Sequence, residues 1–157
     1  MERACIFCDI VSAKAPSHQI WNADEHVAFL SIFPNTEGVA VVIPKEHHAS
    51  YAFALPDETL TRLVLAAKQV ALLIDATFED VGRTAMVFEG YGVDHVHAKL
   101  FPMHGTAAAQ DWKKISSSID TYFDTYEGYI SSHDAARADD GQLAELAKRL
   151  REKAAQG

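Results

Sequence analysis

Two histidines and a lysine alternate with apolar residues in the segment HVHAKLF at positions 95–101. Successive side chains of a β-strand point to opposite faces of the sheet, so His95, His97 and Lys99 share one face. The other face is apolar: Val96, Ala98 and Leu100. A neutral imidazole is a nucleophile at neutral pH, and an ammonium beside it offsets negative charge, which suits phosphoryl or nucleotidyl transfer. The alternative interpretation is a half-buried strand with solvated polar residues.

The loop before this segment, GYGVD at positions 90–94, contains two glycines. Glycine lets backbone N–H groups approach an anion closely, because it has no side chain in the way. The loop therefore fits a phosphate-binding role beside His97, although most Gly-x-Gly tripeptides are simple turns.

A second group of reactive residues lies at the N-terminus, where Cys5 and Cys8 form a Cys-x-x-Cys pair. Two thiolates at this spacing are a common half-site for tetrahedral zinc, which needs two further ligands. Five histidines are candidates for these positions: His47, His48, His95, His97 and His104. A redox pair is disfavoured because no strand precedes the cysteines, and two buried free thiols are the remaining alternative.

The bulk composition is that of an ordinary globular protein. The chain has 157 residues, of which 48% are hydrophobic and 23% charged, and one domain is expected. A net charge of −8 argues against binding to nucleic acid or to an anionic membrane surface, which requires a cationic face. No apolar run has the length of a membrane span and no signal-peptide pattern is present, so we expect a cytoplasmic protein.

The elements that position these residues follow from hydrophobic periodicity. Short segments rich in β-branched and aromatic residues predict strands at 18–21, 26–32, 38–44, 83–90 and 95–102. Between them, apolar residues recur at helical spacing over 57–78: Leu60, Leu63, Val64, Ala67, Val70, Ala71 and Ile74. Pro56 and Asp57 are the expected start signals of this helix, one fixing φ and the other capping. The pattern predicts an α+β fold, an antiparallel β-sheet with one long helix.

The last third of the chain carries a weaker signal. We expect loop and short helix over 106–138 and an amphipathic C-terminal helix over 140–153, whose apolar face holds Leu143, Leu146 and Leu150. The whole chain, 1–157, is then a single domain, with a core at 1–105 and a C-terminal extension at 106–157.

The segment at 95–101 resembles the signature of the histidine-triad (HIT) superfamily, His-φ-His-φ-His-φ-φ, in which φ is an apolar residue. The segments CIFCDIVSAKAPSHQIW and HVAFLSIFPNTEGVAVVIPKEH, the long helix and the signature follow the family's order from residue 5 to about 102. The resemblance implies an antiparallel sheet with flanking helices, usually paired as a homodimer. It also implies hydrolysis or transfer of nucleoside monophosphates, from dinucleoside polyphosphates or nucleotide conjugates, through a covalent nucleotidyl-histidine.

The resemblance implies roles for individual residues. His97 would attack the α-phosphorus, and His95 would join Cys5, Cys8 and His47 around a structural zinc, as in zinc-bearing branches of the family. His47 is preferred to His48 because it ends the segment IPKEH at 43–47. The implied substrate-binding residues are Lys99, Gly92, Val93, Ser31, Phe7 and Ile10, with Phe7 and Ile10 at positions that commonly wall the base pocket.

The chain also departs from the family pattern at several positions. Lys99 replaces the third histidine, and Ser31 replaces an acidic residue that usually binds ribose hydroxyls. Val39, Tyr91 and Gly92 replace a histidine, a glutamine and a serine. These changes leave the nucleophile in place but remove much of the usual hold on ribose and phosphate, so adenosine specificity does not follow.

Three hypotheses remain open at this stage. The first is a nucleotide hydrolase or nucleotidyltransferase with His97 as nucleophile, and the second is a catalytically weak nucleotide-binding or signalling module with a structural zinc. The third makes His95 and His97 a catalytic metal pair, as in cupin-type barrels, but the long helix disfavours an all-β barrel.

Overall fold

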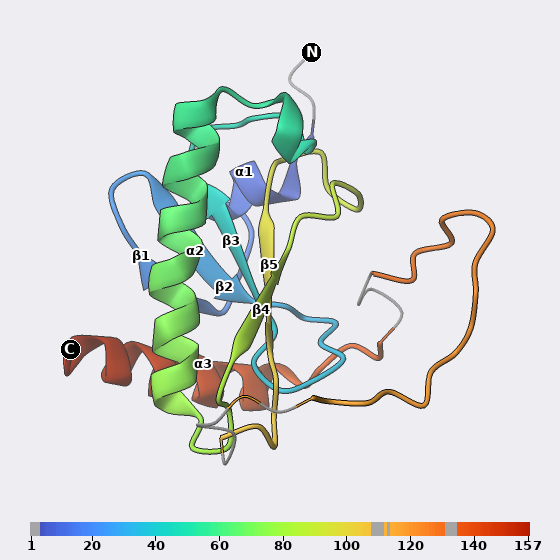
Figure 1. Cartoon of the computed structure of the whole chain (residues 1–157). Helices are drawn as coiled ribbons and strands as arrows, with labels where there is room; N and C mark the ends of the chain where they lie inside the picture. Colours follow the sequence, from blue (N-terminus) through green and yellow to red (C-terminus); the bar gives the residue numbers. More distant parts are fainter. Residues whose placement is uncertain (1–3, 108–111, 113, 131–134) are drawn as a thin grey trace.

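The computed structural model describes residues 4–107, 112, 114–130 and 135–157 and has an α+β architecture built on one five-stranded antiparallel sheet (Figure 1). The strand order is β1-β2-β3-β5-β4, and every neighbouring pair is antiparallel. The strands are β1 (Gln19–Asn22), β2 (His26–Leu30), β3 (Ala40–Pro44), β4 (Thr84–Val87) and β5 (Ala98–Pro102). The helices are α1 (Ile6–Val11), the 3₁₀ turn η1 (Ala52–Ala54), α2 (Asp57–Thr77) and α3 (Asp140–Ala155).

Helices cover both faces of the sheet. In Figure 1, α2 runs in front of the strands, α1 lies behind them and α3 crosses one end. Alternation along β2 explains the layers, because Ala28 and Leu30 pack into the core with α2 and α3 while Val27 and Phe29 pack with α1. The sheet is therefore buried on both sides at its centre.

Helix α2 confirms the predicted long amphipathic helix, with a shifted buried face. Its fully buried residues are Leu63, Ala67, Val70 and Ile74. Ala66 and Leu73 are also buried, whereas Val64, which the periodicity placed on the apolar face, lies outside the core cluster. Pro56 is the N-cap residue, and no side chain caps the helix, so the expected capping by Asp57 was wrong.

Strand β1 has the predicted length, shifted by one residue, whereas the other four strands are shorter than predicted, and the difference matters most at β5. The sequence pattern predicted a strand from residue 95, but pairing with β3 ends at Val42 opposite Ala98. Before Ala98 the backbone does not pair with β3, and the N–H of Val96 instead donates to the carbonyl of His48 at 2.9 Å. The alternation of faces nevertheless extends to Val96, which is fully buried in the core with Ala98 and Leu100.

The C-terminal helix α3 is part of the same core. Leu143, Leu146 and Leu150 are buried against the sheet and α2, as the periodicity predicted. Asp139 caps α3 by accepting from the N–H of Gln142 at 2.9 Å. The described residues between 106 and 138 form loop only, without the short helix that we expected there.

Among the described helices, none combines the length and the apolar character needed to cross a membrane.

The helix α1 was not predicted. It spans only six residues, and its burial pattern, with Phe7 and Ile10 against the sheet, is too short to be distinguished from a strand by periodicity. The N-cap of α1 is Cys5 and the helix contains Cys8, so its geometry holds both thiols on one side of the first turn.

Candidate functional site

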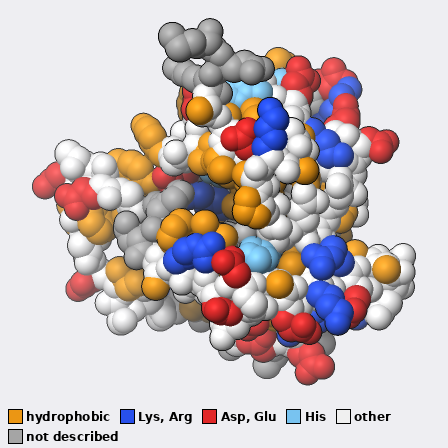
Figure 2. Space-filling view, turned by 180° about the vertical axis from the view of Figure 1, so that it is seen from behind, with side chains coloured by type: hydrophobic (Ala, Val, Ile, Leu, Met, Phe, Trp, Pro, Cys, Tyr) orange, Lys and Arg blue, Asp and Glu red, His pale blue; other side chains and the backbone are white. Residues whose placement is uncertain are grey.

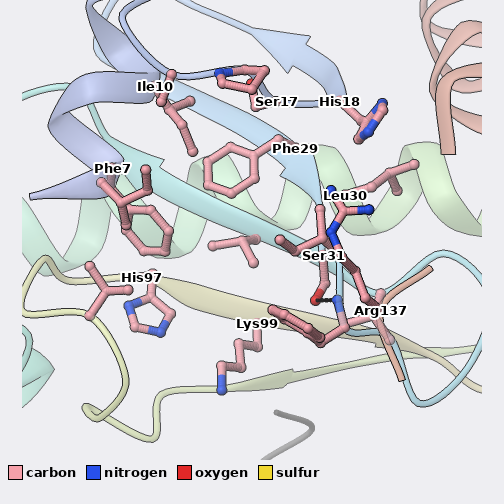
Figure 3. A pocket seen from close by; sticks show the side chains of 18 of the residues that line it. Phe7, Ile10, Ser17, His18, Phe29, Leu30, Ser31, His97, Lys99 and Arg137 are labelled. Atoms are coloured by element: carbon pink, nitrogen blue, oxygen red, sulfur yellow. Dashed lines mark hydrogen bonds between the residues drawn. The ribbon is translucent and has the colours of Figure 1, made fainter. Parts of the chain in front are cut away.

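A cavity of about 570 Å³ lies on the α1 side of the sheet, and His97 and Lys99 line it (Figure 3). His97 directly precedes β5 and Lys99 is its second residue, and both face the cavity because Ala98 between them points into the core. The space-filling view from behind shows a hollow bordered by apolar side chains, with a basic side chain inside it (Figure 2).

The wall of the cavity is mostly apolar. The contributing side chains come from α1, β2, β3 and the loop before β5: Ile6, Phe7, Ile10, Phe29, Val39, Val41 and Val93. The ring of Phe7 contacts Phe29 edge-on with 5.4 Å between centroids, and contacts His97 in the same way at 5.3 Å. Such a lining accepts a flat apolar group and leaves orientation to a few polar side chains.

The position of one hydrogen on the His97 ring follows from its hydrogen bond. Nδ1 of His97 lies 2.8 Å from the carbonyl oxygen of His95, and the ring is only 4% exposed. Since a carbonyl can only accept, Nδ1 carries the hydrogen and donates. In the neutral ring the lone pair then resides on Nε2, and this is the tautomer that a nucleophilic histidine requires.

Lys99 forms an ion pair inside the protein. Its Nζ donates to Oε2 of Glu89 at 3.3 Å, and each of the two side chains is 5% exposed. Tyr126 from the C-terminal extension lies beside this pair, where partial burial and the negative charge of Glu89 raise its pKa. Glu89 was not among the predicted site residues, and the sequence offers no periodic signal for it, because it follows the end of β4.

Next to the cavity, four potential metal ligands lie together. The ligand atoms of Cys5, Cys8, His47 and His95 are all within 4.8 Å of one another. Cys8 Sγ lies 3.4 Å from Nδ1 of His47 and 3.6 Å from Nδ1 of His95. Zinc bound tetrahedrally to sulfur and nitrogen at ~2.0–2.3 Å implies ligand separations of about 3.3–3.8 Å. The donor set and its spacing therefore fit a zinc ion.

A hydrogen bond on one side of the His95 ring directs the other side toward the thiols. Its Nε2 lies 2.8 Å from the carbonyl oxygen of Pro44, to which it donates, so Nδ1 faces Cys5 and Cys8. The residue is fully buried, and burial lowers its pKa, which favours the neutral form that binds metal. His48 lies outside the group, with Nε2 3.7 Å from Glu46.

The predicted substrate-binding residues divide between the cavity and its surroundings. Those that line the cavity are Phe7, Ile10, Ser31, Val93 and Lys99. Gly92 does not line it, and the adjacent Tyr91 is 65% exposed and stacks on Tyr126 with 5.8 Å between ring centroids. Ser31 Oγ accepts from the N–H of Phe33 at 3.2 Å, which stabilises the turn after β2.

The far end of the cavity holds polar residues that the sequence did not indicate. His18, Arg137 and Asp140 line it there together. His18 and Asp140 are 122 positions apart, yet their side-chain atoms lie 2.9 Å from each other. No motif connects them, because only the packing of α3 against β1 brings these segments together.

Comparison with known proteins places the chain among relatives of similar fold. The HIT domain family model matches residues 12–106. The adenosine 5′-monophosphoramidase HNT1 of Saccharomyces cerevisiae is 35% identical over 102 residues, which cover 65% of this chain and 64% of that protein. The adenosine 5′-monophosphoramidase hnt1 of Schizosaccharomyces pombe is 36% identical over 103 residues, 63% of this chain and 74% of that protein.

A zinc-bound histidine triad family protein from Mycobacterium smegmatis has a similar fold, with a TM-score of 0.70 at 22% identity. The superposition covers 98% of this chain and 94% of that one, so it includes the region beyond residue 106. The match to the Saccharomyces protein spans less than two thirds of its length. The family match covers more than half of the chain and includes the signature at 95–101, and the chain therefore belongs to the HIT domain family.

Proposed function

We propose that the protein is a nucleotide hydrolase or nucleotidyltransferase in which Nε2 of His97 attacks the α-phosphorus. The observation that carries the proposal is the hydrogen bond from Nδ1 of His97 to the carbonyl of His95, made by a ring that lines the cavity. This bond orients the ring and leaves the lone pair on the other nitrogen. The α+β fold and the family membership support nucleotide chemistry at the same position.

The reaction proceeds in two displacements. In the first, a bond forms between Nε2 and phosphorus while the bond from phosphorus to the leaving group breaks, and the leaving group departs with the electron pair and gains a proton. In the second, water or another acceptor attacks phosphorus and loses a proton, and the phosphorus–nitrogen bond breaks to restore His97. Lys99 lies on the same face and stabilises the negative charge on the phosphoryl oxygens.

The substrates we propose are nucleotide conjugates, with nucleoside phosphoramidates first. Both yeast relatives described above carry the name adenosine 5′-monophosphoramidase, and the apolar wall between Phe7, Ile10 and Phe29 has the character of a base-binding pocket. Ser31 and Val93 also line the cavity, and we propose that they contact the substrate. Gly92 has a φ of +87° in the loop before β5, and its proposed role is to let the backbone of that loop approach the phosphate.

We propose that Cys5, Cys8, His47 and His95 hold a structural zinc. The spacing of their ligand atoms fits this ion, and the neighbouring fold from Mycobacterium smegmatis is described as zinc-bound. When bound, zinc supplies a cross-link between α1, the loop after β3 and the start of β5. Those three segments also carry Phe7 and His97, so the cross-link fixes the cavity wall relative to the nucleophile.

We also propose that residues 1–157 are one domain and that it works as a homodimer. Packing of α3 into the same core as the sheet supports the single domain. The extension exposes large apolar side chains, which in the proposed dimer would pack against the partner: Trp112, Ile115, Ile119 and Tyr122. Light scattering at micromolar concentration measures the molar mass in solution and so tests the dimer. The cytoplasmic location stays a prediction.

A second candidate is a nucleotide-binding or signalling module with little turnover. Neutralisation of Lys99 by Glu89 favours it, because a paired cation has less electrostatic effect on a phosphoryl group. The two candidates differ in whether a covalent intermediate forms on His97.

The deciding experiment is intact-protein mass spectrometry after rapid mixing with adenosine 5′-phosphoramidate and acid quenching. We expect a mass increase of one nucleotidyl group, located on His97 by peptide mapping and absent in His97→Ala. His104→Gln is the matched control, since His104 lies outside the cavity and should retain the adduct. A wild-type protein that binds nucleotide but forms no adduct and no product would instead favour the binding module.

A further inference from the structure

The end of the cavity opposite His97 is built by the C-terminal extension. Arg137 and Asp140 reach the cavity from the segment that leads into α3, and His18 reaches it from the segment before β1. Figure 3 shows Arg137 and His18 on the Ser31 side, with Phe29 between them and His97. The cavity therefore has two polar ends separated by an apolar wall.

Specific contacts hold this polar end in place. The N–H of Ala138 donates to the carbonyl of Ile32 at 2.8 Å, which ties the extension to the turn after β2. Asp139 caps α3, and Arg151 on the same helix donates to the carbonyl of Gln19 at 2.6 Å. Asp140 is thus a preorganised part of the cavity wall.

The three side chains form one hydrogen-bonded group. Oδ1 of Asp140 lies 2.9 Å from Nε2 of His18 and 3.2 Å from an Nη atom of Arg137. Its Oδ2 accepts from the second Nη of Arg137, also at 3.2 Å. The bonds from His18 and Arg137 lower the pKa of Asp140, so its carboxylate stays ionised.

The charge of this group limits what it can bind. The charges of Arg137 and Asp140 cancel, and the guanidinium fork is already occupied by the carboxylate. A second phosphate would need to displace Asp140 from Arg137. The Asp140 side chain is 62% exposed, and its carboxylate oxygens have more lone pairs than these contacts use, so the carboxylate can still accept from a neutral donor.

We propose that Asp140, positioned by Arg137 and His18, binds a neutral hydrogen-bond-donating group of the nucleoside and so determines substrate specificity. The inference rests on the proposed function, because it takes the nucleotide phosphate to lie at His97. Donors of this kind come from the ribose hydroxyls or from the amino and amide edge of a base. In dinucleotide-binding sites the same distinction holds, with an acidic residue for a ribose hydroxyl and arginine for a phosphate.

The test compares kcat/KM for paired substrates with the wild type, Asp140→Ala and Asp57→Ala. One pair is adenosine 5′-phosphoramidate and its 2′,3′-dideoxy analogue, which isolates the hydroxyls. The other is guanosine against adenosine 5′-phosphoramidate, which isolates the base edge. A hydrogen bond to a charged group predicts wild-type discrimination of about tenfold on one pair, falling close to one in Asp140→Ala.

Asp57→Ala is the matched control, because it removes the same atoms from the first residue of helix α2, which makes no capping bond and does not line the cavity. Its discrimination should equal that of the wild type even if its melting temperature falls. The inference is overturned if Asp140→Ala keeps the wild-type ratios, if the wild type discriminates on neither pair, or if a 2′-phosphorylated nucleotide is preferred to its hydroxyl form. Turnover retained by His97→Ala would instead overturn the proposed function.

Discussion

The ammonium of Lys99 and the carboxylate of Glu89 lie 3.3 Å apart inside the protein, with each side chain only 5% exposed. A basic residue at the third position of the signature is therefore balanced by an acidic residue ten positions earlier, on the strand-to-loop segment beside it. The pair is a matched unit, and breaking it leaves a buried charge without its counter-ion.

Glu89→Gln should lower the free energy of unfolding by about 3 kcal/mol, because Lys99 then remains buried without its carboxylate. Glu89→Gln combined with Lys99→Met should recover most of this loss, since the apolar side chain has similar length and no charge. Urea denaturation of the wild type, the two single variants and the double variant measures the coupling. Additive effects in this cycle would contradict the pairing.

Cys8→Ser should abolish stoichiometric zinc binding, because Cys8 contacts both His47 and His95. Loss of the cross-link should cost several kcal/mol, a fall in melting temperature of about 10 °C for a domain of this size. Elemental analysis gives the metal content and calorimetry gives the melting temperature. His48→Gln is the control and should keep one zinc per chain, since its ring lies outside the ligand group. Full metal content in Cys8→Ser would count against the site.

His104 joins three turns at the end of the sheet away from α1. Its Nε2 donates to the carbonyl of Glu37 at 2.8 Å, and its Nδ1 lies 3.1 Å from a carboxylate oxygen of Asp80. The Glu37 carbonyl, and then Asp80, raise the pKa of His104, while the bond from His104 lowers the pKa of Asp80. Both shifts favour the charged pair in the folded state.

The stabilisation from His104 is complete below its ordinary pKa of about 6.5 and disappears as the pH rises through the raised value. The contribution of Asp80 is present above its ordinary value of 3.8 and disappears as the pH falls through the lowered one. His104→Gln should therefore cost about 1 kcal/mol at pH 5.5 and less at pH 9. Unfolding free energies at both pH values measure the difference, and an equal cost at each would exclude the charged pair.

Gly38→Ala should destabilise the fold by about 2–4 kcal/mol. Gly38 has φ +88°, where an L-residue costs about 1–2 kcal/mol, and a Cβ would lie 2.7 Å from the ring of Phe78. Gly105→Ala is the matched control, because its φ is +77° but nothing lies within 4 Å of the added Cβ. Thermal unfolding should show the larger shift for Gly38→Ala, and equal shifts would mean that the contact with Phe78 is unimportant.

Much of the fold could be predicted, because the spacing of apolar residues distinguishes helices from strands and marks the buried face of each. The long helix has apolar residues at helical spacing from Leu60 to Ile74, and Leu143, Leu146 and Leu150 mark the buried face of α3. The start of β5 was placed three residues early, since the alternation of faces continues past the last pairing with β3. Periodicity reports which side a residue faces and not where the hydrogen-bonded ladder ends.

The candidate site could be predicted where a local motif carries it. Cys5, Cys8, His47 and His95 lie together as the resemblance implied, and His97 lies on the cavity side of β5. Glu89, Arg137 and Asp140 were missed because each reaches its place through tertiary packing, without a characteristic spacing. The role of Gly92 stays a prediction, because the loop that contains it lies beside the cavity while the residue itself does not line it.

The cavity is closed by segments from opposite ends of the chain, since Ala138 bonds to Ile32 and α3 packs against β1. During synthesis, the strands and His97 are translated before α3, which is the last element of the chain. The growing chain therefore holds the complete HIT signature before the residues that finish the cavity wall exist. A chain that stopped before residue 137 would keep the signature but lack Arg137, Asp140 and the helix that packs against β1.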